Sequence, residues 1–356
     1  MARTAVPALD HLLALTDDVG LLQHARRNVP NRAHGYCLDD VGRALVIACD
    51  AAAHPMSAAV GRRLLSIYLA YIVDAQRYDG RFHNFMGYDR RWQDHGGTDD
   101  SFGRACWGLG YAATHAPDRE TRTVARELLS AALPHVAELP FLRSRAYAAL
   151  GLVHVVAVDR RDVAASAALR AAVTAIYDAY RTAGAPEWQW CEAVMTYDNA
   201  RLCEALMRAG STLDEPELFA AGREMLDFYA RVTMEDGTFV PIGNDGWYAR
   251  GGTRARFAQQ PLEAAALVDA AAFALVVTDD ARYRALVQAG YEWYFGRNLR
   301  GATLVESGGC RDGIGEREIN VNMGAESTLA YLMSAYTTGR VASISERRTL
   351  LHATGL

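Results

Sequence analysis

The stretch "PLEAAALVDAAAFALV" at residues 261–276 has helix-forming residues and few charges beyond its first turn. A helix that is apolar nearly all round is enclosed by other elements, whereas a helix with one apolar stripe has its other face in water. This stretch therefore predicts a helix inside a helical assembly.

On either side of this stretch, two kinds of predicted helix alternate along the chain. Segments rich in Ala, Gly and Leu predict inner helices at 39–52, 100–114, 143–157, 197–209, 261–276 and 324–338. Striped, charged segments predict outer helices at 7–16, 57–76, 119–138, 162–183, 214–232 and 280–296. Strand patterns are scarce, so the fold is expected to be all-α.

Six outer and inner helices in alternation favour six helical hairpins in two concentric rings, an (α/α)6 barrel. The competing interpretation is an open α-solenoid, but the repeat here is longer and less regular than in tetratricopeptide or ankyrin arrays. The length of 356 residues fits one large domain or two ordinary ones. We expect a single barrel domain over residues 1–356.

The composition narrows the classes of function. The chain is 51% hydrophobic with a net charge of −5, so it has no basic surplus for nucleic acid or an anionic membrane. The six cysteines lack zinc-type or disulfide-scaffold spacing. No signal peptide or 18-residue apolar run is present, which predicts a soluble, cytoplasmic protein without membrane contact.

The predicted connections are asymmetric. Links from inner to outer helices are short, whereas most links from outer to inner helices are long and contain aromatics, glycines and acids, as in "YDGRFHNFMGYDRRWQDHGGTDD". Long structured loops in a compact domain are usually functional. Since these loops all precede inner helices, we expect them to gather at one end of the barrel, above the inner-helix N-termini.

Acids and arginines recur at these N-termini, in "YCLDDVGRALVIA" (36–48), "TDDSFGRACWGL" (98–109) and "TYDNARLCEAL" (196–206). A first-turn carboxylate can simply cap a helix. However, Asp40 with Arg43, Asp100 with Arg104, and Asp198 with Arg201 have i,i+3 or i,i+4 spacing, so each pair can meet on one face. On otherwise apolar helices such charges must be paired or line a wet cavity.

Cleavage of a glycosidic bond needs two carboxyl groups, one protonated and one ionised. The candidates are Asp40, Asp99, Asp100, Glu192, Asp198, Asp312 and Glu326. Asp100 and Glu192 rank first as catalytic acid and base or nucleophile, followed by Asp40 and Asp198. Arg43, Arg104 and Arg201 are expected to orient carboxylates or, in a phosphorylase, to hold phosphate.

Aromatic side chains accompany polar ones in several long loops. In "PEWQWCEAVMTYDNARLCEAL", Trp188 and Trp190 are suited to stacking on the C–H face of a sugar, although packing of the loop on the barrel explains them too. The other predicted substrate-binding residues are Trp92, Asp99, Tyr197, Asn199, Trp247, Asp312, Asn320, Asn322 and Glu326.

Metal and nucleotide motifs are missing from the sequence. No HxxxH or HExxH pair occurs, and the glycine-rich "SGGCRDGIG" has neither a GK[ST] ending nor a strand-turn-helix context. The sequence therefore predicts neither a metal nor a cofactor.

Four segments carry a family resemblance: "HARRNVPNRAHGYCLDDVGRALVIA", "FHNFMGYDRRWQDHGGTDDSFGRACWGLG", "WQWCEAVMTYDNARLCEALMRAG" and "NVNMGAESTLAYLMSAY". They resemble bacterial glycosidase-like proteins found alone or fused behind glycosyltransferase domains. The barrel type is similar to that of unsaturated glucuronyl hydrolases and N-acylglucosamine 2-epimerases. The resemblance implies a helical toroid acting on carbohydrate, with a glycosyltransferase as a conceivable separate partner.

The leading hypothesis from the sequence is a glycoside hydrolase, or a phosphorylase, acting on short oligosaccharides. A sugar epimerase or isomerase on the same barrel is the second hypothesis, although that chemistry commonly uses histidines and this chain is richer in carboxylates. The third is a non-catalytic glycan-binding module of a polysaccharide-synthesis system.

Overall fold

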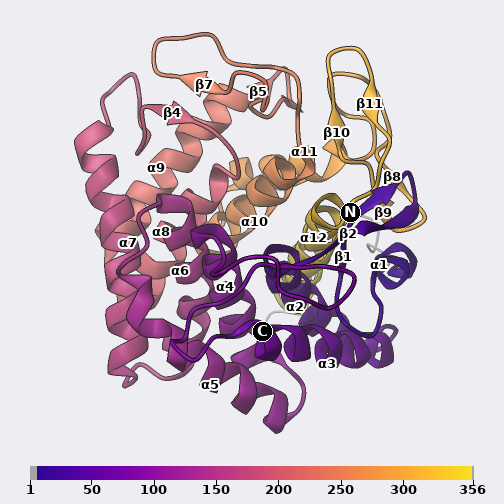
Figure 1. Cartoon of the computed structure of the whole chain (residues 1–356). Coiled ribbons are helices and arrows are strands. Elements are labelled where there is room, and N and C mark those ends of the chain that lie inside the picture. Colours follow the sequence, from indigo (N-terminus) through magenta and orange to yellow (C-terminus); the bar gives the residue numbers. More distant parts are fainter. Residues whose placement is uncertain (1–5, 355–356) are drawn as a thin grey trace.

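The computed structural model describes the backbone of residues 6–354 and the side chains of residues 6–344. Six inner helices form a ring, because each contacts the next and the last contacts the first. They are α2 (Leu38–Ala53), α4 (Asp99–His115), α6 (Leu142–Val158), α8 (Ala200–Leu213), α10 (Pro261–Thr278) and α12 (Ala325–Thr354). The closed ring excludes an open solenoid and confirms the (α/α)6 barrel (Figure 1).

Each inner helix packs against one outer helix. The outer helices are α1 (Asp10–Leu15), α3 (Ala58–Ala75), α5 (Arg119–Val136), α7 (Val163–Ala183), α9 (Pro216–Thr233) and α11 (Ala281–Trp293). The predicted distinction between the two kinds holds: α10 is buried along most of its length, whereas α5 and α9 bury one face. By length and composition α10 alone among the described helices could cross a membrane, but 78% of it is buried inside the ring.

Short strands, which the sequence did not predict, lie in the connections. The loop before α2 holds β1 (Leu22–Arg26) and β2 (Val29–Cys37), and β3 (Phe85–Met86) of the loop before α4 pairs with β2. Two-residue strands pair within the later loops, as β5–β6 (Met234–Glu235, Thr238–Phe239), β8–β9 (Val305–Glu306, Gly309–Cys310) and β10–β11 (Gly313–Ile314, Ile319–Asn320). Finally, β4 (Val194–Met195) pairs with β7 (Tyr248–Ala249) and ties two long loops together. In Figure 1 the loops with β4, β7, β10 and β11 project from the same end of the helices.

Glycines set the spacing of the inner helices beneath these loops. A Cβ atom on Gly42 of α2 would lie 2.5 Å from the main-chain oxygen of Arg104 on α4. One on Gly103 of α4 would lie 2.3 Å from the main-chain oxygen of Ser144 on α6. Both distances are too short for any side chain, so only glycine allows this close approach. As a result, the first turns of α2, α4 and α6 can exchange side-chain contacts.

Candidate active site

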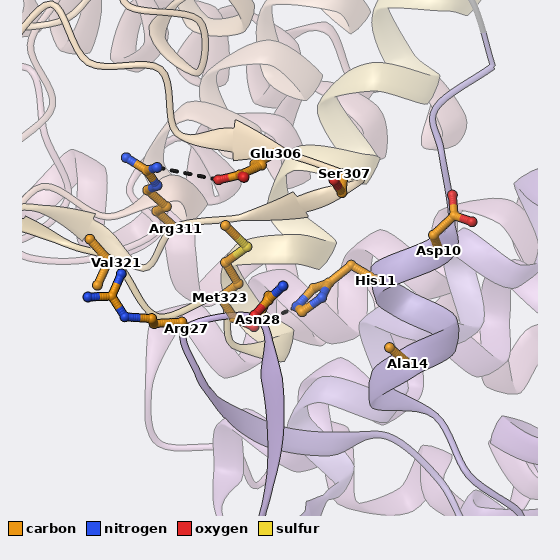
Figure 2. A pocket seen from close by; sticks show the side chains of 10 residues that line it. All are labelled: Asp10, His11, Ala14, Arg27, Asn28, Glu306, Ser307, Arg311, Val321 and Met323. Atoms are coloured by element: carbon orange, nitrogen blue, oxygen red, sulfur yellow. Dashed lines mark hydrogen bonds and ion pairs between the residues drawn. The ribbon is translucent and has the colours of Figure 1, made fainter.

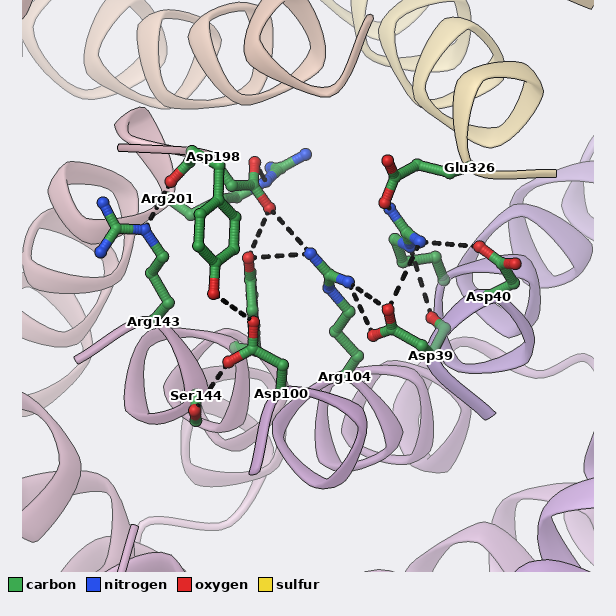
Figure 3. Close-up of polar contacts among 12 residues, drawn as sticks. Asp39, Asp40, Asp100, Arg104, Arg143, Ser144, Asp198, Arg201 and Glu326 are labelled. Carbon is green, nitrogen blue, oxygen red and sulfur yellow. Dashed lines mark hydrogen bonds and ion pairs between the residues drawn. The ribbon is translucent and has the colours of Figure 1, made fainter. Parts of the chain in front are cut away.

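Polar side chains lie at the N-termini of all six inner helices, at the end of the ring that carries the long loops. Figure 3 shows those of α2, α4, α6 and α12 together with Asp198 before α8. The full set comprises Asp39 and Asp40 on α2, Asp99 and Asp100 on α4, Arg143 and Ser144 on α6, Asp198 and Asn199 before α8, Glu263 on α10, and Glu326 on α12. We call this set the mouth, together with Arg43, Arg104, Tyr147, Glu192, Tyr197 and Arg201, which contact its members.

One half of the mouth joins α2, α4 and α12. Arg43 donates to Asp40 at 2.7 Å and to Glu326 at 2.9 Å. Arg104 was expected to pair with Asp100 on its own helix, but its Nη1 instead donates to both oxygens of Asp39 at 2.6 Å. The close approach of α2 and α4 makes this interhelical pair possible.

The other half joins α4, α6 and the loop before α8. Asp100 accepts hydrogen bonds from Ser144 at 2.8 Å and from the hydroxyl of Tyr197 at 2.6 Å. Arg143 Nη1 donates to both oxygens of Glu192, at 2.8 and 2.9 Å. The guanidinium of Arg143 also lies over the ring of Tyr197, 4.8 Å from its centroid. Asp100 and Glu192 are therefore held by one connected group.

Tyr147 and Asp198 connect the two halves. The Tyr147 hydroxyl accepts from Arg104 at 3.0 Å and donates to Asp198 at 2.7 Å. Asp198 is buried, and its Oδ1 lies 3.6 Å from Nε of Arg201. Its backbone adopts φ 50°, a left-handed conformation that costs roughly 1–2 kcal/mol in a residue other than glycine. Such strain persists where surrounding contacts fix the residue, often at functional sites.

Some acids of the mouth are partly exposed to solvent, whereas its arginines are buried. The four arginines, Arg43, Arg104, Arg143 and Arg201, are only 2% to 5% exposed. In contrast, the side chains of Asp39, Glu192 and Glu326 are 25%, 27% and 38% exposed, and Asp100 is also partly exposed. A substrate entering the mouth would thus meet carboxyl groups first.

Neighbouring acids in the mouth differ in pKa. Burial alone would raise the pKa of Asp39, but the charges of Arg104 and Arg43 outweigh it and hold the pKa below its ordinary value. Burial raises the pKa of Asp40 to about 6, despite the opposing charge of Arg43. The mouth therefore combines a carboxylate that stays ionised with a carboxyl that keeps its proton in mild acid.

Several buried atoms beneath the mouth have no hydrogen-bond partner among the described residues. They are Nε of Arg104, Oδ1 of Asp198, Nε of Arg201 and Oε1 of Glu263. Buried polar atoms are nearly always paired, so a cluster of unpaired ones needs an explanation. Two of them, Oδ1 of Asp198 and Nε of Arg201, face each other at 3.6 Å.

Two of the four predicted catalytic residues are not accessible. Asp40 and Asp198 are both buried, Asp40 under Arg43 and Cys37, and Asp198 between Arg104 and Arg201. Asp100 and Glu192 are partly exposed, and the structure brings them together through Tyr197 and Arg143.

The predicted stacking role of Trp188 and Trp190 needs correction. Both indoles are buried in the core, where Trp188 packs edge-on against Phe228 and Tyr248. A buried ring cannot stack on a sugar, so packing of the loop on the barrel explains the pair. Trp92 is partly exposed and stacks on His83 at 5.1 Å.

The remaining predicted residues lie in the loops and rim around the mouth. Trp247 is half-buried, with its indole N–H donating to Asn244. Asp312 accepts from the main-chain N–H of Gly324 at 2.8 Å, and burial raises its pKa. Asn320 and Asn322 accept main-chain hydrogen bonds from Asn322 and Arg27, so both shape the loop before α12. Asp99 is partly exposed beside Asp100.

Sequence reasoning missed five mouth residues: Asp39 as a site residue, Arg143, Ser144, Tyr147 and Glu263. One signal could have found Asp39 and Glu263, because both are acids in the first turn of an inner helix. Arg143 and Ser144 occupy the same place on α6 but are not acids. Tyr147 lies one turn further in and carries no comparable signal.

Two further observations concern metal binding and the surroundings of the mouth. Within the described residues, no three His, Cys, Asp or Glu side chains are grouped to hold a metal ion. A separate pocket of about 350 Å³ lies beside α1, between the β1–β2 and β8–β9 turns (Figure 2). Its wall includes Arg311, which is 3.4 Å from Glu306, and no mouth residue lines it.

Comparison with known proteins supports the fold. No protein-family model and no curated protein matches the chain. Among solved structures, cellobiose 2-epimerase from Bacillus thermoamylovorans is 9% identical with a TM-score of 0.72, over 95% of this chain and 96% of the epimerase. Cellobiose 2-epimerase from Spirochaeta thermophila is 13% identical with a TM-score of 0.71, over 96% of both chains.

Glycosidases share the barrel as well. An inactive variant of a GH76 α-1,6-mannanase from Salegentibacter, solved with α-1,6-mannotetrose, is 10% identical with a TM-score of 0.60, over 93% of this chain and 96% of the mannanase. At these identities the likenesses establish the (α/α)6 barrel. Both sugar epimerases and glycoside hydrolases use this fold.

Proposed function

We propose that the protein is a glycoside hydrolase-type enzyme that cleaves short oligosaccharides in the mouth. The observation that carries the proposal is the convergence of partly exposed carboxyl groups, each fixed by a buried arginine or by hydroxyl groups. Asp39, Asp100, Glu192 and Glu326 have this arrangement. A pair of such groups on opposite sides of a glycosidic bond is what its cleavage requires.

We assign Asp100 as the acid and Glu192 as the base or nucleophile. Asp100 is partly exposed, and hydroxyl groups donate to both of its oxygens, which fixes its orientation in the mouth. As the acid, it would give a proton to the glycosidic oxygen as the C–O bond breaks. Glu192, paired with Arg143, would take a proton from the attacking water or attack the anomeric carbon itself.

Adjacent aspartates are also a feature of the mannanase that shares this barrel. Its inactive variant has two adjacent aspartates replaced by alanine. This chain has adjacent aspartates at the starts of α2 and α4, and in the pair Asp99 and Asp100 both are partly exposed.

A sugar epimerase remains the second candidate, because the epimerases have the higher TM-scores. General acid–base work in such chemistry commonly uses histidine. Among the described side chains, the inner-helix histidines are His115 and His154, at the C-terminal ends of α4 and α6, away from the mouth. Other histidines, such as His34 and His83, lie in the loops before α2 and α4, so the products decide between cleavage and epimerisation.

The test is a product analysis with matched variants. The protein is incubated with cellobiose, α-1,6-mannotetraose and related oligosaccharides, and the products are identified by chromatography and NMR. We expect new reducing ends, and a loss of at least about a hundredfold in kcat for Asp100→Asn and for Glu192→Gln, in line with the usual contribution of acid–base groups. Glu187→Gln, in the same loop as Glu192 but exposed and paired with Arg250, should leave kcat unchanged.

Two results would overturn the assignment. Full activity in both mouth variants would remove Asp100 and Glu192 from the mechanism. An unchanged chain length with an altered sugar at the reducing end would show epimerisation in place of cleavage.

A further inference from the structure

Glu263 is a buried carboxyl group at the mouth that the assignment above does not use. It lies in the first turn of α10, and its Oε2 accepts hydrogen bonds from the Tyr229 hydroxyl at 2.7 Å and from Nδ2 of Asn199 at 3.2 Å. Its other oxygen, Oε1, is buried and has no hydrogen-bond partner among residues 6–344. Burying an incompletely satisfied carboxyl is unfavourable, so its presence needs a reason.

Asn199 passes the effect of Glu263 to the catalytic half of the mouth. Its side chain is fully buried, and its Oδ1 accepts from Nη2 of Arg143 at 3.2 Å. Nδ2 of the same amide donates to Glu263 and, at 3.0 Å, to the main-chain oxygen of Thr196, so the carboxyl and this oxygen together fix which way the amide faces. With the amide reversed, an N–H group would point at the guanidinium and the contact with Arg143 would be lost.

Arg143 in turn orients both proposed catalytic groups. Its Nη1 binds the two oxygens of Glu192, and its Nε donates to the main-chain oxygen of Tyr197 at 2.5 Å. The hydroxyl of that tyrosine donates to Asp100. A continuous chain of contacts therefore leads from Glu263 to the acid and to the base.

We propose that Glu263 is a positioning residue that fixes Asn199 and, through it, the guanidinium that holds Glu192 and Tyr197 in place. This inference rests on the proposed function. Small displacements of catalytic groups reduce rates strongly, so a residue outside contact with substrate can control turnover.

The protonation state of Glu263 adds a pH dependence. Burial and the nearby charge of Asp198 raise its pKa to about 7, opposed by hydrogen bonds from Tyr229 and Asn199 and by the charge of Arg143. The charge of Arg254 acts on Tyr229, the hydroxyl of which donates to Glu263. When Glu263 ionises, it repels Asp198 and competes with Glu192 for Arg143. We expect the mouth to be better ordered when Glu263 is protonated.

The experiment compares Glu263→Gln with Glu263→Ala over pH 5 to 9. We expect Glu263→Ala to lower kcat at least about tenfold while KM changes little, because positioning acts on the chemical step. Glu263→Gln keeps an oxygen for Tyr229 and Asn199, so kcat at pH 6 should stay within about threefold of the wild type. The fall in kcat/KM of the wild type near pH 7 should be absent in this variant.

Three outcomes overturn the inference. One is an unchanged inflection near pH 7 in Glu263→Gln. Another is wild-type kcat in Glu263→Ala. The third is a crystal structure of Glu263→Ala in which Arg143 and Glu192 keep their positions, a readout that does not need a substrate. If the wild type itself cleaves no sugar, the proposed function fails, and the crystal structure still decides the positioning role.

Discussion

The two ends of the inner ring carry the same kinds of charged residue in opposite arrangements. At the mouth the arginines are buried and five of the eight acids are partly exposed, whereas Asp40, Asp198 and Glu263 are buried. At the far end Glu204 and Asp269 are buried, whereas the side chains of Arg208 and Arg340 are 27% and 52% exposed. A cavity of only about 50 Å³ lies there, lined in part by His154.

The helix termini explain this inversion. The N-terminal end of a helix favours negative charge and the C-terminal end favours positive charge, so parallel inner helices favour exposed acids at one end and exposed cations at the other. Arg201 joins the two ends, because it lies beside Asp198 and donates to Glu204 and Asp269, both at 2.7 Å. The comparison teaches that partly exposed acids gather at the end of the ring where the arginines paired with them are buried.

The largest expected effect concerns that support. Arg104→Met removes the buried cation that holds Asp39 and lies beside Asp198, and breaking a buried pair costs about 3–5 kcal/mol. Arg208→Met at the far end removes a partly exposed cation, and the buried Glu204 keeps its bond to Arg201, so the loss should be smaller, about 1–2 kcal/mol. Urea unfolding of both variants measures the difference. Equal losses would show that the two ends are stabilised alike.

The sequence predicted this architecture well because the pattern that identifies each helix lies within the residues of that helix. The all-round apolar pattern at 261–276 and its five counterparts identified the inner helices, and the long loops predicted the end of the ring at which the mouth residues lie. Boundaries were less accurate: α8 begins at Ala200 and not at 197, because Asp198 is left-handed and Asn199 precedes the helix, and α12 continues to Thr354. The predicted ends of the single domain, 1–5 and 355–356, lie outside the described residues.

Which acid faces the mouth could not be predicted from the sequence. Adjacent residues on a helix point about 100° apart, so the rotation of α2 decides that Asp39 is exposed and Asp40 buried. That rotation depends on packing, such as the contact of Gly42 with α4. The same limit applies to Trp188 and Trp190, since alternation in a loop does not show which side faces the core.

A smaller effect is expected when two acids at opposite ends of the same helix are each replaced by asparagine. Asp39 lies in the first turn of α2 and Asp50 near its end, where Asp50 accepts from Tyr111 at 2.6 Å and pairs with Arg340 at 2.7 Å. We expect Asp39→Asn to lower kcat/KM by about tenfold or more, because an ionised carboxylate is lost from the mouth. Asp50→Asn should leave it within about twofold. A comparable loss in both variants, with both folded by circular dichroism, would contradict a site confined to the mouth.

The smallest effect is the response of the two ends to pH, which should have opposite signs. His154, at the far end, has a pKa well below its ordinary value because of burial and the charges of Arg208, His115 and Arg340. The unfolded chain therefore binds the extra proton more readily, so this group removes stability as pH falls below about 6.5. The pKa of Glu263 is raised, so the folded state holds the extra proton, and stability is lost as pH rises from about 4.5 toward 7.

This reversal is tested by measuring the unfolding free energies of the wild type, His154→Gln and Glu263→Gln between pH 5 and 7. The difference between each variant and the wild type is then compared across this range. We expect the His154→Gln variant to gain relative stability toward pH 5 and the Glu263→Gln variant to gain it toward pH 7, each by on the order of 1 kcal/mol. Parallel slopes for the two variants would mean that the ends of the ring do not differ in proton binding. The opposite arrangement of charges at the two ends would then have no effect on how stability depends on pH.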